Sequence, residues 1–98
     1  MAEIIRAPKA LNDLEALIAY ISRDAPIAAR RFAQKLLRRV EALEDQHLMG
    51  GVIREDQTKT YREVLQGNYR VIYRVAGEQV IIVAVHHAAR LLDARDRN

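Results

Sequence analysis

Residues 60–87 read TYREVLQGNYRVIYRVAGEQVIIVAVHH, and this stretch decides the fold. It is rich in β-branched residues and tyrosine, which favour strands. Two turn signals, Gly67-Asn68 and Ala76-Gly77-Glu78, divide it. The pattern predicts strands over Thr60 to Gln66, Tyr69 to Val75 and Gln79 to His87. Because the connections are so short, we expect the three strands to form an antiparallel meander.

The third strand is apolar at every position from Val80 to Val85, so both of its faces need cover. Simple alternation would direct either Ile81, Val83 and Val85 or the set Val80, Ile82 and Ala84 toward any helices that pack on this sheet. The other face can be covered by the C-terminal tail, by a second copy of the chain or by a partner chain. The pattern leaves these three alternatives open.

The N-terminal half has helical periodicity after a short strand, Glu3 to Arg6, which Pro8 ends. The apolar stripe of the first predicted helix comprises Leu11, Leu14, Ile18 and Ile21. That of the second comprises Ala29, Phe32, Leu36, Val40 and Leu43. Pro8 and Pro26 fall in the first turns, and Asp24 is the predicted N-cap of the second helix. The short connection predicts an antiparallel helical hairpin.

These elements predict an α+β fold: a short N-terminal strand, then the two-helix hairpin packed on one face of a sheet, then the three-stranded meander. Four helical side chains should face the sheet, namely Leu14, Ile18, Phe32 and Leu36. Residues 47–60 contain Gly50-Gly51 and mixed charge and are interpreted as a loop, and residues 90–98 as a short helix or a frayed tail. The 98 residues predict a single domain spanning 1–98.

Composition narrows the possible functions. There is no cysteine, which excludes disulfides and cysteine-ligated metals, and no signal peptide or membrane span is recognisable. We therefore expect a soluble, cytoplasmic protein without membrane association. The net charge is +3, and Arg supplies 13 of the 16 basic residues. An Arg-rich surface can simply be solvated, or it can bind an acidic partner, either nucleic acid or an acidic peptide.

No nucleophile motif and no Gly-rich phosphate loop occurs, and no cofactor is expected. His86 and His87 are adjacent on a strand and should point to opposite faces, which argues against a metal site. Arg62, Arg70 and Arg74 project from the strands, and Arg90 follows them. Such a cluster can stabilise a phosphoryl transition state, bind acidic side chains of a partner, or serve as edge charge against aggregation.

The segment from Tyr61 to Val75, followed by Val80 to Arg90, resembles the C-terminal half of ParE/RelE toxins. The YRVIYR core and the H-x-x-R ending carry this resemblance. Pro8 with the following ALNDL, and Pro26 with AARRF, resemble the first and second helices of the family. The resemblance implies the toxin of a type II toxin–antitoxin system, neutralised by a small ParD-like antitoxin. It also implies that the toxin is brought to operator DNA only through the antitoxin, which binds that DNA.

Two activities occur in this superfamily: inhibition of DNA gyrase by binding, and ribosome-dependent cleavage of messenger RNA. For the second activity the resemblance implies a catalytic set of Arg62, Arg70, His87 and Arg90. The match is partial, because Val64 replaces a basic residue and Asp96 falls near the place of the family's C-terminal Tyr. The long hairpin and the H-x-x-R ending look more like ParE. We therefore expect a gyrase inhibitor, with the ribosome-dependent endoribonuclease as the alternative.

Overall fold

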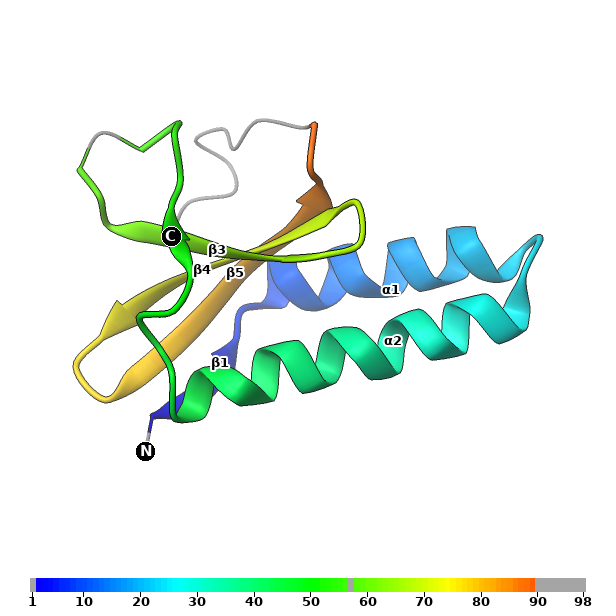
Figure 1. Ribbon diagram of the computed structural model, residues 1–98. Coiled ribbons are helices and arrows are strands. Elements are labelled where there is room, and N and C mark those ends of the chain that lie inside the picture. The colour runs from blue at the N-terminus through cyan, green and yellow to red at the C-terminus, as the bar shows by residue number, and fades with distance from the viewer. Residues whose placement is uncertain (1, 57, 90–98) are drawn as a thin grey trace.

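The computed structural model describes residues 2–56 and 58–89 (Figure 1). The elements in chain order are β1 (Glu3–Arg6), α1 (Pro8–Ser22), α2 (Pro26–Glu41), the 3-10 helix η1 (Ala42–Glu44), β2 (Gly51–Val52), β3 (Tyr61–Gln66), β4 (Tyr69–Ala76) and β5 (Gln79–His87). The strands form one sheet in the order β1-β5-β4-β3-β2. β1 is parallel to β5, and the other pairs are antiparallel. The predicted α+β fold is confirmed.

Both helices begin at proline, as the sequence predicts. The predicted N-cap at Asp24 is wrong, because the N-cap of α2 is Ala25 and no side chain caps it. The reason is steric: Pro26 is the first helical residue, and a proline pushes the residue before it out of the helical region. Ala25 accordingly has φ −147° and ψ 74°.

The hairpin packs on one face of the sheet, where α1 contacts β5 and α2 contacts β3. Leu14, Phe32 and Leu36 contact this core as expected, but Leu17 takes the place predicted for Ile18, and Leu11 is exposed. The buried Ala10 explains the difference. On a helix Leu14 and Leu17 lie within about 40° of Ala10, whereas Leu11 and Ile18 lie about 90° away.

A β-bulge in β5 changes which side chains face the helices. Tyr73 pairs with Ile82, but the preceding Ile72 pairs with Ala84, so Val83 is the extra residue. The helix-facing set on β5 is therefore Val80, Ile82 and Val85, whereas Ile81, Val83 and Ala84 lie on the opposite face. Neither of the two alternating sets predicted from the sequence is right.

The opposite face of β5 is covered by the segment predicted to be only a loop. Ile53 and Tyr61 pack there against Ile72, Val83 and Ala84, and Ile53 is only 1% exposed. The same segment includes the short edge strand β2, which the sequence did not reveal. The chain thus supplies a cover that was not among the three expected ones. The predicted tail, residues 90–98, lies outside the described residues.

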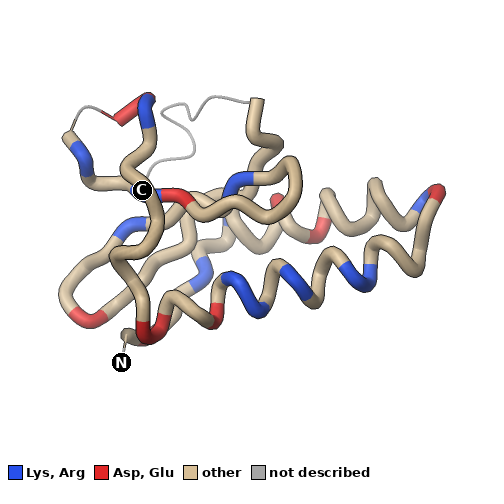
Figure 2. The backbone as a smooth tube through the Cα atoms, viewed as in Figure 1, with Lys and Arg blue, Asp and Glu red and all other residues tan. Residues whose placement is uncertain are grey.

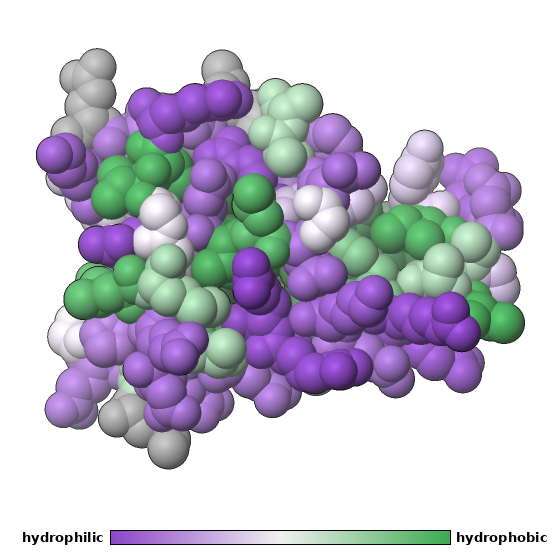
Figure 3. Space-filling view, viewed as in Figure 1, coloured by the Kyte–Doolittle hydropathy of each residue, from purple (hydrophilic) through white to green (hydrophobic). Residues whose placement is uncertain are grey.

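The surface is divided by chemical character. Basic residues recur along α2 (Figure 2), and this helix forms a largely hydrophilic ridge in the space-filling view (Figure 3). Hydrophobic surface appears instead over the sheet side and toward the outer end of the hairpin (Figure 3). Within the described part of the chain, neither helix has the length and apolar character needed to cross a membrane.

We predict that Ile53→Ala lowers the free energy of unfolding by about 2–5 kcal/mol, since it opens a cavity under Val83 and Ala84. The control is the neighbouring Val52→Ala, because Val52 is 41% exposed. That change should cost no more than about 0.5 kcal/mol. Urea denaturation of both variants is the measurement. Equal effects of the two substitutions would show that Ile53 does not seal this face.

Candidate functional site

Arg70 is the most enclosed charged group on the sheet face away from the helices. In β4 it pairs with Leu65 of β3 and His86 of β5. Its Nη1 and Nη2 donate to Oε2 and Oε1 of Glu55 at 2.7 and 3.0 Å, and its Nε donates to Oε1 of Glu63 at 2.5 Å. The side chains of Arg70 and Glu55 are 4% and 8% exposed. The guanidinium therefore already binds two carboxylates.

The electrostatics of this cluster favour a permanently charged Arg70. The hydrogen bonds that Arg70 donates to Glu55, and then to Glu63, outweigh desolvation and raise the pKa of Arg70. A planar guanidinium paired in a bidentate way with a carboxylate is a strong interaction. A phosphate could reach these donors only by displacing Glu55 or Glu63. The cluster is thus built to hold the loop against the sheet.

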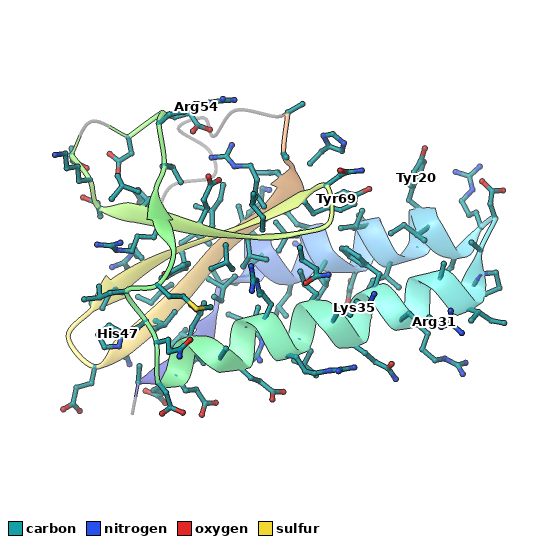
Figure 4. All side chains as sticks on the ribbon, viewed as in Figure 1. Tyr20, Arg31, Lys35, His47, Arg54 and Tyr69 are labelled. Atoms are coloured by element: carbon teal, nitrogen blue, oxygen red, sulfur yellow. The ribbon has the colours of Figure 1, made fainter. Side chains whose placement is uncertain are left out.

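An open hollow of about 240 Å³ lies beside this cluster. Its lining consists of Val52, Arg54, Glu63, Leu65, Arg70 and Ala88. Val52 and Leu65 are exposed apolar side chains, and Arg54 is an exposed cation on the side of the sheet away from the helices (Figure 4). This mixture suits contact with a segment that carries both apolar and acidic groups.

Arg62 lies on the helix side of the sheet, because it pairs directly with Tyr73. Its Nη1 donates to the carbonyl oxygens of Gly50 and Leu48 at 2.7 and 3.3 Å. The buried Tyr73 hydroxyl donates to the carbonyl oxygen of His47 and accepts from the backbone N–H of Gly50. Burial raises the pKa of Tyr73. Arg62 and Tyr73 together fasten the segment that leads into β2.

Gly50 permits this close approach. A Cβ atom at this position would lie 2.5 Å from the carbonyl oxygen of Glu63 and 2.6 Å from the hydroxyl of Tyr73. No side chain fits there without displacement of the backbone of β3. The Gly50-Gly51 pair, predicted only to mark a loop, therefore marks a point where two chain segments touch.

The two histidines point to opposite faces. His86 is buried and pairs with Arg70, whereas His87 is exposed and its ring meets the edge of the Tyr69 ring at 5.5 Å. Tyr69 in turn contacts Phe32 of α2 (Figure 4). The backbone N–H of Ala89 donates to Nδ1 of His87. His87 is on the helix side, because it pairs with Tyr69, whose ring packs on α2. It also borders a hollow of about 260 Å³ beside α1.

The predicted catalytic set does not converge in the described residues. Arg62 and His87 lie on the helix side of the sheet, and Arg70 lies on the other side. Arg90 is outside the described residues. Within residues 2–56 and 58–89, no three side chains of the metal-ligating types group closely enough to hold a metal ion.

Sequence reasoning missed the acidic residues that organise the loop. Asp56 accepts from the backbone N–H and hydroxyl of Thr58 through Oδ1, and from the N–H groups of Thr60 and Tyr61 through Oδ2. The hydrogen bond from the Thr58 side chain is the largest cause that lowers the pKa of Asp56. The D-x-T spacing is a signal for such an Asx turn. The hairpin register makes Glu63 a diagonal neighbour of Arg70, whereas no spacing rule brings Glu55 to it.

Comparison with known proteins places this architecture in a family. Residues 4–92 match the family model of the ParE toxin of the type II toxin–antitoxin system parDE. The chain belongs to the ParE toxin family. It is also 37% identical over 92 residues to Toxin RelE2 of Caulobacter vibrioides, a match that covers 93% of this chain and 100% of that protein. The chain is thus a toxin of a type II toxin–antitoxin system.

Solved structures share the fold. The chromosomal ParDE system of P. aeruginosa gives a TM-score of 0.73 at 20% identity, over 89% of this chain and 96% of that chain. The RelBE2 complex of Mycobacterium tuberculosis gives a TM-score of 0.56 at 17% identity, over 88% of this chain and 96% of that chain. The YoeB-YefM complex of Staphylococcus aureus gives a TM-score of 0.59 at 13% identity, over 89% of this chain and 97% of that chain. At these identities the likeness concerns the fold alone.

We predict that Glu55→Gln lowers the free energy of unfolding by about 1–3 kcal/mol, since it weakens a buried charged hydrogen-bond pair. Glu78→Gln is the control, because Glu78 is exposed at the turn between β4 and β5. It should change stability by less than about 0.5 kcal/mol. Urea denaturation compares the two. If Glu55→Gln were as mild as Glu78→Gln, Glu55 would not hold Arg70.

Asp56 also gives a pH prediction. The pKa of Asp56 is lower in the folded protein than the ordinary value of 3.8. The ionised carboxylate therefore contributes its full stabilisation to the fold at pH values above 3.8. This contribution is lost as the pH falls through the folded pKa. Asp56→Asn should therefore be less stable than the wild type at neutral pH, and this difference should narrow in acid. Thermal or urea unfolding from neutral pH to about pH 2.5 measures the difference. A difference that stays constant would contradict this role.

Proposed function

We propose that this toxin inhibits DNA gyrase by binding it, without catalysing a reaction of its own. The observation that carries the proposal is the enclosure of Arg70 by Glu55 and Glu63. Arg70 is one of the three arginines that the family resemblance assigns to RNA cleavage, and here its donors are occupied by carboxylates. Binding a protein target needs an exposed surface and no proton shuttle, so it is compatible with this arrangement.

RNA cleavage makes stricter demands on the residues. The 2′-hydroxyl must lose a proton, the phosphorane must be stabilised, and the leaving oxygen must gain a proton. Arginine stays protonated and cannot act as the base. His87 is the exposed histidine of the β5 end, but it lies across the sheet from Arg70. Arg62 lies on the side of His87, yet its guanidinium donates to backbone carbonyls.

A ribosome-dependent endoribonuclease is the second candidate. It is favoured by the 37% identity to a protein named Toxin RelE2. In this alternative the catalytic residues would be Arg62, Arg70, His87 and Arg90, and messenger RNA bound to the ribosome would be the substrate. Glu55 and the loop around it would then have to leave Arg70 before a phosphate could bind. This requirement makes gyrase the preferred target.

The proposed regulator is a small ParD-like antitoxin. The hairpin exposes large apolar side chains, namely Leu11, Tyr20, Ile27 and Leu37. A narrow apolar hollow between α1, α2 and β5 adjoins Leu11, and the edge strand β2 exposes Val52. An amphipathic helix can pack on the hairpin, and an extended segment can extend the sheet at β2. Both contacts would cover apolar surface that the free toxin leaves in water.

A paired assay tests the target. Purified toxin is added to gyrase in a supercoiling reaction and, separately, to translating ribosomes with mapping of messenger cleavage. We expect supercoiling to be inhibited and messenger RNA to stay intact. His87→Ala should leave gyrase inhibition unchanged, as should the control His47→Ala. Addition of the antitoxin encoded beside the toxin should restore supercoiling.

Cleavage of messenger RNA would contradict the gyrase proposal. Codon-specific cleavage that His87→Ala abolishes and His47→Ala preserves, with supercoiling untouched, would replace gyrase by the ribosome as the target. Cleavage unaffected by either histidine would exclude both the gyrase proposal and the catalytic role of His87.

A further inference from the structure

Four of the five exposed basic side chains of α2, Arg31, Lys35, Arg38 and Arg39, are here called the cationic stripe, in which Arg39 lies at the edge next to β3. All four are exposed, whereas Leu36 and Val40 of the same helix are buried. At about 100° per residue, Arg31, Lys35 and Arg38 lie within roughly 60° of one another and opposite the buried side. Figure 2 shows the basic positions recurring along α2, and Figure 4 shows Arg31 directed away from the sheet.

Within the described part of the chain, no stripe residue forms an ion pair with a carboxylate of its own helix. Residues 26–40 contain no Asp or Glu, and Glu41 is the last residue of α2. Among the described residues the ion pairs are those of Lys9 and Arg70, and none includes the stripe. Arg39 donates through Nε to the carbonyl oxygen of Leu65, which leaves its charge uncompensated.

The stability of α2 does not explain why its exposed side carries these like charges. Lys35 stands three or four positions from Arg31, Arg38 and Arg39, and like charges at these spacings destabilise a helix. Arg38 and Arg39 interact favourably with the C-terminal end of the helix dipole, but Arg31 lies too early in α2 for that effect. A charge pattern that weakens its own helix is explained by an external polyanion.

We propose that the cationic stripe of α2 binds the phosphate backbone of duplex DNA. Arg31 and Arg39 are eight residues apart, or about 12 Å along the helix, and B-DNA presents a charge about every 1.7 Å of its axis. Several phosphates therefore fall within reach of the stripe. From Arg31 to Arg39 this side of α2 carries charge and no exposed apolar anchor, whereas the exposed Ile27 lies one turn earlier. The stripe is separate from Arg70, whose charge Glu55 and Glu63 neutralise.

Duplex DNA fits the shape of this surface better than duplex RNA does. The hairpin projects beyond the sheet, with α2 as its outer ridge (Figures 1 and 3). The major groove of B-DNA is about 12 Å wide and admits a helix, whereas the major groove of A-form RNA is too narrow. Operator DNA was expected to contact the antitoxin alone. The stripe gives the toxin a direct phosphate contact of its own, whichever cellular target it inhibits.

The experiment measures binding of the purified chain to a labelled duplex of about 30 base pairs by fluorescence anisotropy, from about 25 to 200 mM salt. The stripe variant carries Arg31→Gln, Lys35→Gln and Arg38→Gln. The matched control carries Arg6→Gln, Arg23→Gln and Lys59→Gln, all exposed positions off α2. Each variant changes the net charge from +3 to 0, since three cations are removed. Gln is a good helix former, and circular dichroism verifies that both variants fold.

We expect the logarithm of the wild-type association constant to fall with the logarithm of salt at a slope of about −3.6, which corresponds to about four phosphate contacts. The stripe variant should lose at least about tenfold in affinity at the lowest salt and most of this slope. The control should keep both. A variant with Arg31→Lys and Arg38→Lys should bind as the wild type does, because phosphate attraction requires charge rather than the guanidinium shape.

If the stripe variant and the control lost the same affinity for the duplex, net charge alone would explain the binding, and the proposal would be overturned. Tighter binding of duplex RNA than of duplex DNA would overturn the choice of nucleic acid. If a polyglutamate peptide bound through the stripe more tightly than the duplex does, the partner of this face would be an acidic protein segment, and the DNA proposal would be overturned. Absence of wild-type binding at the lowest salt would refute the stripe as a DNA contact.

Discussion

The structure depends on one constraint, which is that β5 must be covered on both faces. Val80 and Val83 are fully buried on opposite sides of this strand. The hairpin covers one side, because α1 and α2 are amphipathic and antiparallel. The segment before β3 covers the other side through Ile53. The loop is therefore a structural layer, and Asp56, Glu55 and Arg62 are the polar groups that hold it in place.

The sequence was sufficient for features that depend on local pattern. Strand alternation, the turns at Gly67 and Gly77 and the first-turn prolines all follow from short-range rules, and they gave the element order and the antiparallel meander. The bulge at Val83 could not be predicted, because every residue around it is apolar and no change in polarity marks the shift of register. Ile53 was also hidden, since the apolar pair Val52-Ile53, between two glycines and three charged residues, is too short to show a periodicity.

The candidate site shows the same limit. The opposed directions of His86 and His87 follow from alternation and were predicted. Glu63 is a diagonal neighbour of Arg70 across the hairpin of β3 and β4, but Glu55 comes from the loop, so only the folded loop reveals its pairing with Arg70. The family resemblance gave Arg70 a possible catalytic role, but its neighbours decide what the guanidinium can do. In this chain the neighbours are carboxylates, and its charge is used to hold the loop.

The distribution of the remaining charge fits the proposal of a toxin that acts by binding through its surfaces. Arg62 and Arg70 hold the cover of β5 in place, and the charge of Arg70 is neutralised by Glu55 and Glu63. The free positive charge is concentrated instead on α2, on the far side of the hairpin from the sheet. Apolar surface lies on the hairpin and at the β2 edge, where a partner segment can bury it. A small domain with one core has few residues to spare for a dry, pre-organised active site. It has enough surface to present separate apolar and cationic faces, and binding functions require nothing more.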